Sequence, residues 1–142
     1  MDSASQSIFP QPFRPVGCAE CRNAEALGFD FTMAFQLIVD IEERRPFAYE
    51  ALVRGCNGES AGEVLGWVND NNRYRFDQAC RVKAIEQAAT LGLLDIPDCL
   101  LSINFLPNAV YRAETCIRAT LEAARRFAFP QERLMFEVTE GE

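Results

Sequence analysis

The sequence predicts an α/β domain whose sheet opens with an antiparallel hairpin and continues with parallel strands. Two apolar segments, residues 33–40 and 47–54, are separated only by a polar turn, which is typical of a hairpin. Beyond the hairpin, segments with helical spacing of apolar residues alternate with short apolar segments, which favours parallel strands joined by helical crossovers. The 142 residues fit one domain or part of one, since a domain usually holds about 100–200 residues.

Four short apolar segments are expected to be the strands of this sheet. The first two flank a charged turn that runs from Glu42 to Pro46. The third is apolar except for Ser102 and Asn104, which share a face because side chains alternate along a strand. The expected strands are Met33–Asp40, Phe47–Arg54, Leu100–Phe105 and Leu134–Thr139.

Three helices are expected between these strands. Ser60 and Glu63 have the spacing of a capping box, which predicts a helix from there to about Asn69. Pro107 suits the first turn of the last helix, and Pro130 ends that helix. One face of the second and third helices is expected to be buried, because apolar residues recur there with helical spacing. These residues are Phe76, Cys80, Ala84, Ala88 and Leu91 in the second helix, and Val110, Ala113, Ile117, Leu121 and Ala124 in the third.

Composition narrows the possible classes of function. No segment approaches the roughly 18 consecutive apolar residues of a membrane-spanning helix, and the N-terminus lacks the features of a secretory signal. A net charge of −7 argues against a nucleic-acid partner, which normally requires a basic surface. The sequence contains no histidine, which excludes Ser-His-Asp, Cys-His and histidine-zinc catalysis. Any catalysis must therefore use carboxylates, lysine, thiols or a metal, without a nucleic-acid or membrane partner.

Residues 1–31 are expected to form an irregular N-terminal extension, because closely spaced prolines precede the pair Cys18 and Cys21. A zinc knuckle needs four ligands, and the sequence offers no second pair of this spacing and no histidine. Metal or redox chemistry at this pair is therefore the minor alternative. The six cysteines are expected to be mostly reduced thiols, which predicts a cytoplasmic location.

Two architectures fit this order of elements, a doubly wound sheet and a βα barrel. Polar residues lie in the later part of otherwise apolar strands, at Glu50, Arg54, Asn104 and Glu137. This placement favours the barrel, because enzymes with that fold build their sites at the C-terminal ends of the strands.

Oxygen donors from three strands predict a site for a hard cation such as Mg²⁺, Mn²⁺ or Ca²⁺. Glu50 and Glu137 would supply carboxylates and Asn104 an amide oxygen, while the guanidinium of Arg54 suits a phosphate oxygen. This combination points to metal-assisted chemistry on a phosphate ester. A structural alternative stays open at this point, because Arg54 could instead pair with either carboxylate in an ion-pair network.

Four segments, in order and spacing, strongly resemble the EAL domain family, which hydrolyses the bacterial messenger cyclic di-GMP. The resemblance covers about residues 32–142 and implies a modified TIM-type βα barrel whose first strand runs antiparallel. The segments are Phe35–Asp40, Tyr49–Gly55, Leu101–Phe105 and Phe136–Glu140.

The resemblance also implies a role for each matching residue. In the family, the Glu of the Glu-Ala-Leu signature and two later oxygen donors bind the catalytic metal, Mg²⁺ or Mn²⁺. Neighbouring residues contact the substrate, and a final Glu supports a catalytic loop. The implied metal ligands are Glu50, Asn104 and Glu137, the implied substrate-binding residues are Gln36, Leu52 and Arg54, and the implied loop-supporting residue is Glu140.

The family's remaining catalytic residues would lie beyond residue 142, including an Asp-Asp pair that completes a two-metal site. A βα barrel takes about 250 residues, so this chain is expected to be the N-terminal half of the domain. The parent domain would hydrolyse cyclic di-GMP to linear pGpG, whereas this chain is expected to be inactive alone. The alternative is a catalytically inactive EAL-like module that acts by binding cyclic di-GMP or a protein. Half a barrel would expose two strand edges, which predicts self-association.

Overall fold

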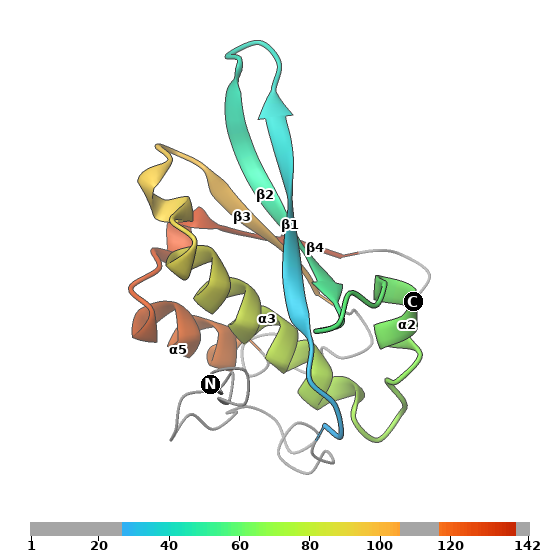
Figure 1. Ribbon diagram of the computed structural model, residues 1–142. Coiled ribbons are helices and arrows are strands. Elements are labelled where there is room, and N and C mark those ends of the chain that lie inside the picture. Colours follow the sequence, from blue (N-terminus) through green and yellow to red (C-terminus); the bar gives the residue numbers. More distant parts are fainter. Residues whose placement is uncertain (1–26, 106–116, 139–142) are drawn as a thin grey trace, which may run out of the picture.

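The computed structural model describes residues 27–105 and 117–138, which form a four-stranded sheet with helices on one face (Figure 1). The strands lie side by side in chain order, the first pair antiparallel and the other two pairs parallel. They are β1 (Thr32–Asp40), β2 (Arg45–Arg54), β3 (Leu100–Asn104) and β4 (Leu134–Glu137). The sheet formed by the described strands does not close on itself. The predicted α/β fold, with an antiparallel first strand and the open sheet of a partial barrel, is confirmed.

The hairpin of β1 and β2 differs from the prediction only at its turn. The turn occupies residues 41–44, with Arg44 at a φ of 56°, and the hairpin extends past the other strands (Figure 1). Pro46, expected in the turn, lies in β2 opposite Val39, where the register shifts after Ile38. A proline is tolerated there because a bulge interrupts the ladder of backbone hydrogen bonds.

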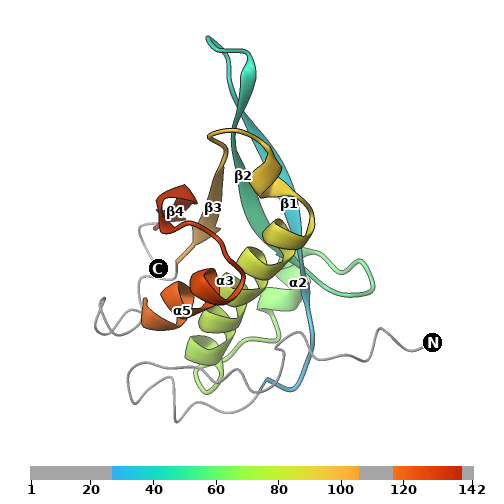
Figure 2. The same ribbon diagram turned by 90° about the vertical axis from the view of Figure 1, so that its left-hand side faces the viewer.

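The helix α3 (Arg73–Thr90) is buried on almost every side rather than along one stripe. It lies between the sheet and the helix α5 (Arg118–Arg126), so both of its sides are covered (Figure 2). Of the residues expected on its buried face, three are buried and one is half-buried: Phe76, Ala84, Ala88 and Cys80, respectively. Leu91 was expected to be buried as well, but its side chain is 72% exposed. The prediction for Leu91 is wrong because the helix ends at Thr90 and Gly92, at a φ of 91°, turns the chain away.

The helix α5 (Arg118–Arg126) packs against α3 through small side chains. Of the stripe expected for this helix, Val110 and Ala113 lie outside the described residues. Leu121 is half-buried, and the fully buried face consists of Ala119, Thr120, Ala123 and Ala124. Small side chains on this face let the two helices approach closely. No helix within residues 27–105 and 117–138 is long and apolar enough to cross a membrane.

The short helix α2 (Ala61–Leu65) begins as the sequence predicts and ends early. The hydroxyl of Ser60 accepts a hydrogen bond from the Glu63 amide, and the Glu63 carboxylate accepts one from the Ser60 amide. The predicted end at Asn69 is wrong. The side chain of Asn69 accepts hydrogen bonds from the amides of Asn71 and Asn72, an arrangement that replaces helical hydrogen bonds with a turn.

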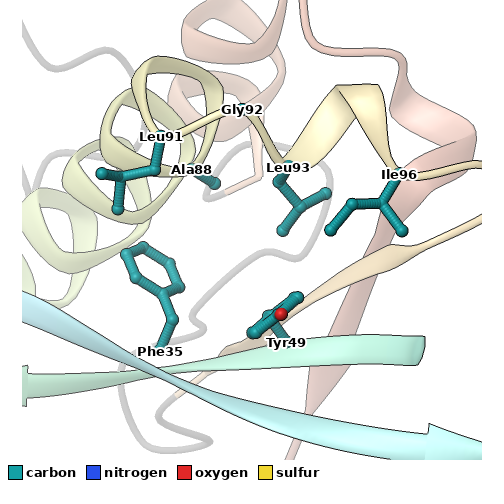
Figure 3. Close-up of a pocket in the computed structure, with 7 residues that line it drawn as sticks. All are labelled: Phe35, Tyr49, Ala88, Leu91, Gly92, Leu93 and Ile96. Atoms are coloured by element: carbon teal, nitrogen blue, oxygen red, sulfur yellow. The ribbon is translucent and has the colours of Figure 1, made fainter.

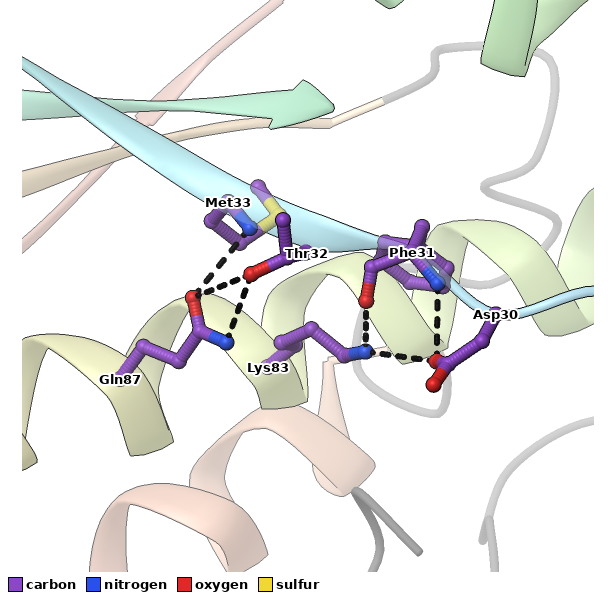
Figure 4. Close-up of polar contacts among 6 residues, drawn as sticks. All are labelled: Asp30, Phe31, Thr32, Met33, Lys83 and Gln87. Atoms are coloured by element: carbon purple, nitrogen blue, oxygen red, sulfur yellow. Dashed lines mark hydrogen bonds and ion pairs between the residues drawn. The ribbon is translucent and has the colours of Figure 1, made fainter. Parts of the chain in front are cut away.

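Polar contacts tie the start of β1 to α3 (Figure 4). The Lys83 ammonium donates to the carbonyl of Phe31 and forms an ion pair with Asp30 at 3.1 Å. One turn further along the helix, the side-chain oxygen of Gln87 accepts a hydrogen bond of 3.2 Å from the Met33 amide. These contacts provide hydrogen-bond acceptors for the ammonium of Lys83, whose side chain is only 1% exposed, and they hold β1 against the helix.

Candidate functional site

The polar residues of the strands lie on the face of the sheet opposite α3 and α5. The apolar core between sheet and helices includes Ala51, Leu101, Ile103 and Phe136, so their neighbours along each strand point to the other face. The register places Glu50 beside Gln36 on one side and Ser102 on the other, and it pairs Asn104 with Glu137. The structure therefore brings together, near the C-terminal ends of β2, β3 and β4, side chains that are far apart in the sequence.

Glu50 is surrounded by the other two predicted metal ligands. Partial burial, and then the negative charge of Glu137 beside it, raise the pKa of the Glu50 carboxyl above its ordinary value. Hydrogen bonding to Glu137 acts in the same direction, because the protonated form of Glu50 can donate to that carboxylate. A hydrogen bond from the Asn104 side chain acts against them and lowers the pKa. The three side chains thus form one electrostatically coupled group.

Ser102 holds Glu137 in this group. Its hydroxyl is fully buried and donates a hydrogen bond of 2.8 Å to Oε1 of Glu137. The sequence showed only that Ser102 shares a face with Asn104, and it attached no function to this serine. The signal that could have found Ser102 is its position two residues before Asn104, which puts both side chains on one face. In the structure, the parallel register places Ser102 beside Met135 in β4, two residues before Glu137.

The three predicted substrate-binding residues also lie on this face. Gln36 is exposed, while Leu52 and Arg54 are half-buried. The guanidinium of Arg54 donates a hydrogen bond of 2.7 Å to the neighbouring carbonyl of Val53. Within residues 27–105 and 117–138, no ion pair joins Arg54 to either carboxylate of the group. The structural alternative, in which Arg54 pairs with one of these carboxylates, is therefore not observed among the residues that the structure describes.

The donor set of this group fits a hard divalent cation. Two carboxylates and one amide oxygen come from three adjacent strands, and such oxygen ligands suit Mg²⁺, Mn²⁺ or Ca²⁺. Burial and then the repulsion from Glu137 raise the pKa of Glu50, and a cation bound between the two carboxylates would remove that repulsion. In the described part of the chain, no cluster of three acidic or cysteine side chains offers a competing metal site.

Glu140 lies outside the described residues, as do Cys18 and Cys21. Among the cysteines that the structure describes, Cys56, Cys80 and Cys99 are free thiols. Burial raises the pKa of the Cys99 and Cys56 thiols, so neither is a reactive thiolate.

A cavity of about 210 Å³ lies on the other side of the sheet, between the hairpin and the end of α3 (Figure 3). Phe35 and Tyr49 from the strands face Ala88, Leu91 and Ile96 across it. This lining is apolar except for the tyrosine hydroxyl, so the cavity does not fit an anionic ligand. The polar face of the sheet is therefore the candidate site.

One protein family matches most of this chain. Residues 21–142 match the family described as the EAL domain. The chain belongs to the EAL domain family. The match begins before residue 32, the first residue of the predicted EAL segment, and it includes all four segments that carry the resemblance.

Two solved structures show what this EAL chain is similar to. A standalone versatile EAL protein from Vibrio cholerae O395, in its c-di-GMP-bound form, is 62% identical with a TM-score of 0.76. The similarity covers 82% of this chain and 48% of the Vibrio chain. BlrP1 from Klebsiella pneumoniae, in a complex with manganese and cy-diGMP, is 27% identical with a TM-score of 0.69. Here the similarity covers 92% of this chain and 34% of BlrP1.

A curated relative comes from Escherichia coli strain K12. The blue light- and temperature-regulated antirepressor BluF is 28% identical over 109 residues, which are 77% of this chain and 26% of BluF. This chain thus spans about half the length of the Vibrio protein and about a quarter to a third of the other two.

Proposed function

We propose that this chain supplies the first metal-binding part of a cyclic di-GMP phosphodiesterase site, which in the parent domain yields linear pGpG. The observation that carries the proposal is the convergence of Glu50, Asn104 and Glu137 from three adjacent strands in an EAL family member. The Vibrio protein, at 62% identity, binds the same dinucleotide according to its description. We further propose a cytoplasmic location, which agrees with the free thiols of the described cysteines.

Each residue of the polar face has a proposed task. Glu50, Asn104 and Glu137 would hold one Mg²⁺ or Mn²⁺, and Arg54 would bind a substrate phosphate with its guanidinium. Gln36 and Leu52 would border the dinucleotide, and Glu140 would support a catalytic loop. A bound divalent cation would supply Lewis-acid polarisation of the phosphodiester and a water of lowered pKa.

The Asp-Asp pair, the catalytic lysine and the further Glu ligand that the family uses are not among the residues of this polar face, so we expect binding without turnover. The sequence has a single lysine, Lys83, and it is buried against Phe31 on the helix side of the sheet. It therefore does not reach the polar face.

The test measures binding and hydrolysis separately in the purified chain. Calorimetry with cyclic di-GMP and Mn²⁺ should give weak, metal-dependent binding, which the variants Glu50→Gln and Arg54→Met should abolish. Chromatography of the nucleotides should reveal no pGpG. Binding that is unchanged in both variants would refute the proposed site, and formation of pGpG by the chain alone would refute the expected inactivity.

A second candidate function is a non-catalytic EAL module that acts through a partner protein. It is favoured by one observation, that the E. coli relative is described as an antirepressor rather than a hydrolase. The net charge of −7 suits a protein partner better than a nucleic acid. Binding of cyclic di-GMP without any requirement for Mn²⁺ would favour this candidate.

A further inference from the structure

A buried polar group lies behind the ends of β3 and β4, on the helix side of the sheet. Arg81, in the middle of α3, is 1% exposed although arginine is rarely fully buried. Its guanidinium forms an ion pair with Asp77, one turn earlier, and its Nε donates a hydrogen bond of 2.6 Å to the Thr120 hydroxyl. Its Cζ lies 4.0 Å from the centre of the Phe105 ring. One side chain thus joins α3 and α5 to the residue that follows β3.

Phe105 is linked in turn to both predicted metal ligands on the opposite face. It directly follows Asn104 in the chain, and its amide donates a hydrogen bond of 2.9 Å to the carbonyl of Glu137. Its ring meets the ring of Phe136 edge-on, with centroids 5.6 Å apart. Because Phe136 precedes Glu137, each of the two packed rings is the chain neighbour of a predicted ligand.

Stability alone is a weak explanation for a buried ion pair at this position. Removing two charges from water is costly, and well-packed apolar residues of similar volume are often at least as stabilising. A guanidinium instead constrains the orientation of the groups it contacts, because it is planar, stacks on aromatic rings and carries its donors in a fixed fork. Arg81 therefore constrains the orientation of the Phe105 ring in a way that an apolar side chain does not.

We propose that Arg81 is a positioning residue, which fixes Phe105 and thereby the directions in which Asn104 and Glu137 present their oxygens. The value of this positioning to activity rests on the proposed metal site. The positioning itself is a property of the protein without metal, so it can be tested separately.

The first test uses nuclear magnetic resonance on the metal-free chain. Thr120→Val removes the acceptor for Arg81 Nε while keeping the shape of the side chain, and Thr120→Ser keeps the acceptor. We expect Thr120→Val to shift the side-chain amide signal of Asn104 and to speed hydrogen exchange at the Phe105 amide by about tenfold. Thr120→Ser should behave like the wild type, and Asn104→Asp identifies the Asn104 signal by its loss.

The second test measures Mn²⁺ affinity by the paramagnetic resonance of the free ion. Thr120→Val should weaken binding by about tenfold, as is usual when a residue that supports a metal ligand is removed, and Thr120→Ser should restore it. Ala88→Gly is the control, because it destabilises the same buried helix about two turns away from Arg81. A merely structural role would make Ala88→Gly and Thr120→Val equally harmful to affinity.

The two tests separate the positioning role from the proposed function. Unchanged Asn104 and Phe105 signals in Thr120→Val would overturn the positioning role, and so would equal changes in Ala88→Gly. If the wild-type chain binds no Mn²⁺, the proposed metal site fails, while the resonance comparison still decides whether Arg81 positions the end of β3.

Discussion

A hydrogen bond of 2.8 Å from the Ser102 hydroxyl to the Glu137 carboxylate joins β3 to β4 on the polar face. We predict that Ser102→Ala weakens Mn²⁺ binding by about tenfold, because a ligating carboxylate that loses its orienting donor binds metal less well. The measurement is a titration of Mn²⁺ followed by paramagnetic resonance, with circular dichroism to verify that the variant is folded.

Ser60→Ala is the matched control for this serine, since it makes the same chemical change at the start of α2. It should lower the free energy of unfolding by about 1 kcal/mol through loss of the helix cap, while Mn²⁺ affinity stays at the wild-type value. Wild-type affinity in Ser102→Ala would contradict the orienting role.

Lys83 gives a prediction about pH. Burial lowers the pKa of its ammonium below the ordinary 10.5, although the neighbouring Asp30 opposes this shift. The unfolded chain then binds more protons than the folded chain in the range between the two pKa values. Stability contributed by the neutral amine should therefore be present above 10.5 and be lost as the pH falls through the folded pKa.

Lysine labelled with ¹³C at Cε should reveal this shift directly, because the sequence contains one lysine and gives one signal. Its titration midpoint should lie below 10.5 in the folded chain and return to the ordinary value in urea. In denaturation at rising pH, Lys83→Met should lack the gain in free energy of unfolding that the wild type acquires. A midpoint at or above 10.5 would disprove the predicted shift.

At the scale of single residues, the sequence could predict which strand positions carry the polar group but not the contacts that hold it. Glu50, Asn104 and Glu137 share one face because strands alternate with a period of two. The hydrogen bond from Ser102 depends on the register of β3 against β4, which no local pattern contains. The burial of Arg81 could not be predicted from the sequence either, since a charged helix residue is normally expected to face solvent.

At the scale of elements, the prediction succeeded where a local signal exists and failed where distant packing decides. The start of α2 follows from the side chains of Ser60 and Glu63, and it was correct. The single stripe expected on α3 was incomplete, because that helix is covered both by the sheet and by α5. Leu91 has the right helical spacing but lies past the end of the helix, a boundary that periodicity does not reveal.

The loop after β2 offers a prediction at this scale, because it begins directly after Arg54. Gly55 is buried, and a Cβ added there would lie 2.6 Å from the Cβ of Glu59. Its amide also donates a hydrogen bond of 2.9 Å to the Glu59 carbonyl. We expect Gly55→Ala to lower the free energy of unfolding by about 1–3 kcal/mol, as is usual for overpacking, and to weaken cyclic di-GMP binding.

Gly28→Ala is the control for this loop, since a Cβ at Gly28 would meet no atom within 4 Å. Its free energy of unfolding in urea should stay within about 0.5 kcal/mol of the wild type. Equal unfolding curves for both variants would mean that the close approach of Gly55 to Glu59 does not constrain the loop.

At the scale of the whole molecule, the open sheet of the described strands leaves two strand edges unpaired. In the part of the chain that the structure describes, β1 and β4 each have a strand neighbour on one side only. Unpaired strand edges are templates for pairing with another chain, and proteins usually blunt them with charges or cover them. On β1, Leu37 and Val39 are 43% and 50% exposed, so this edge presents apolar side chains to solvent.

We therefore predict that the chain self-associates through β1. Light scattering over a range of concentrations should give a mass that rises above the 16.0 kDa of one chain. Val39→Lys should reduce this association, because an edge lysine opposes pairing with a second strand. Leu65→Lys is the matched control, since Leu65 is 49% exposed and lies in α2 rather than in a strand. Equal effects of both variants would indicate general hydrophobic contact, and a constant monomer mass would contradict edge pairing altogether.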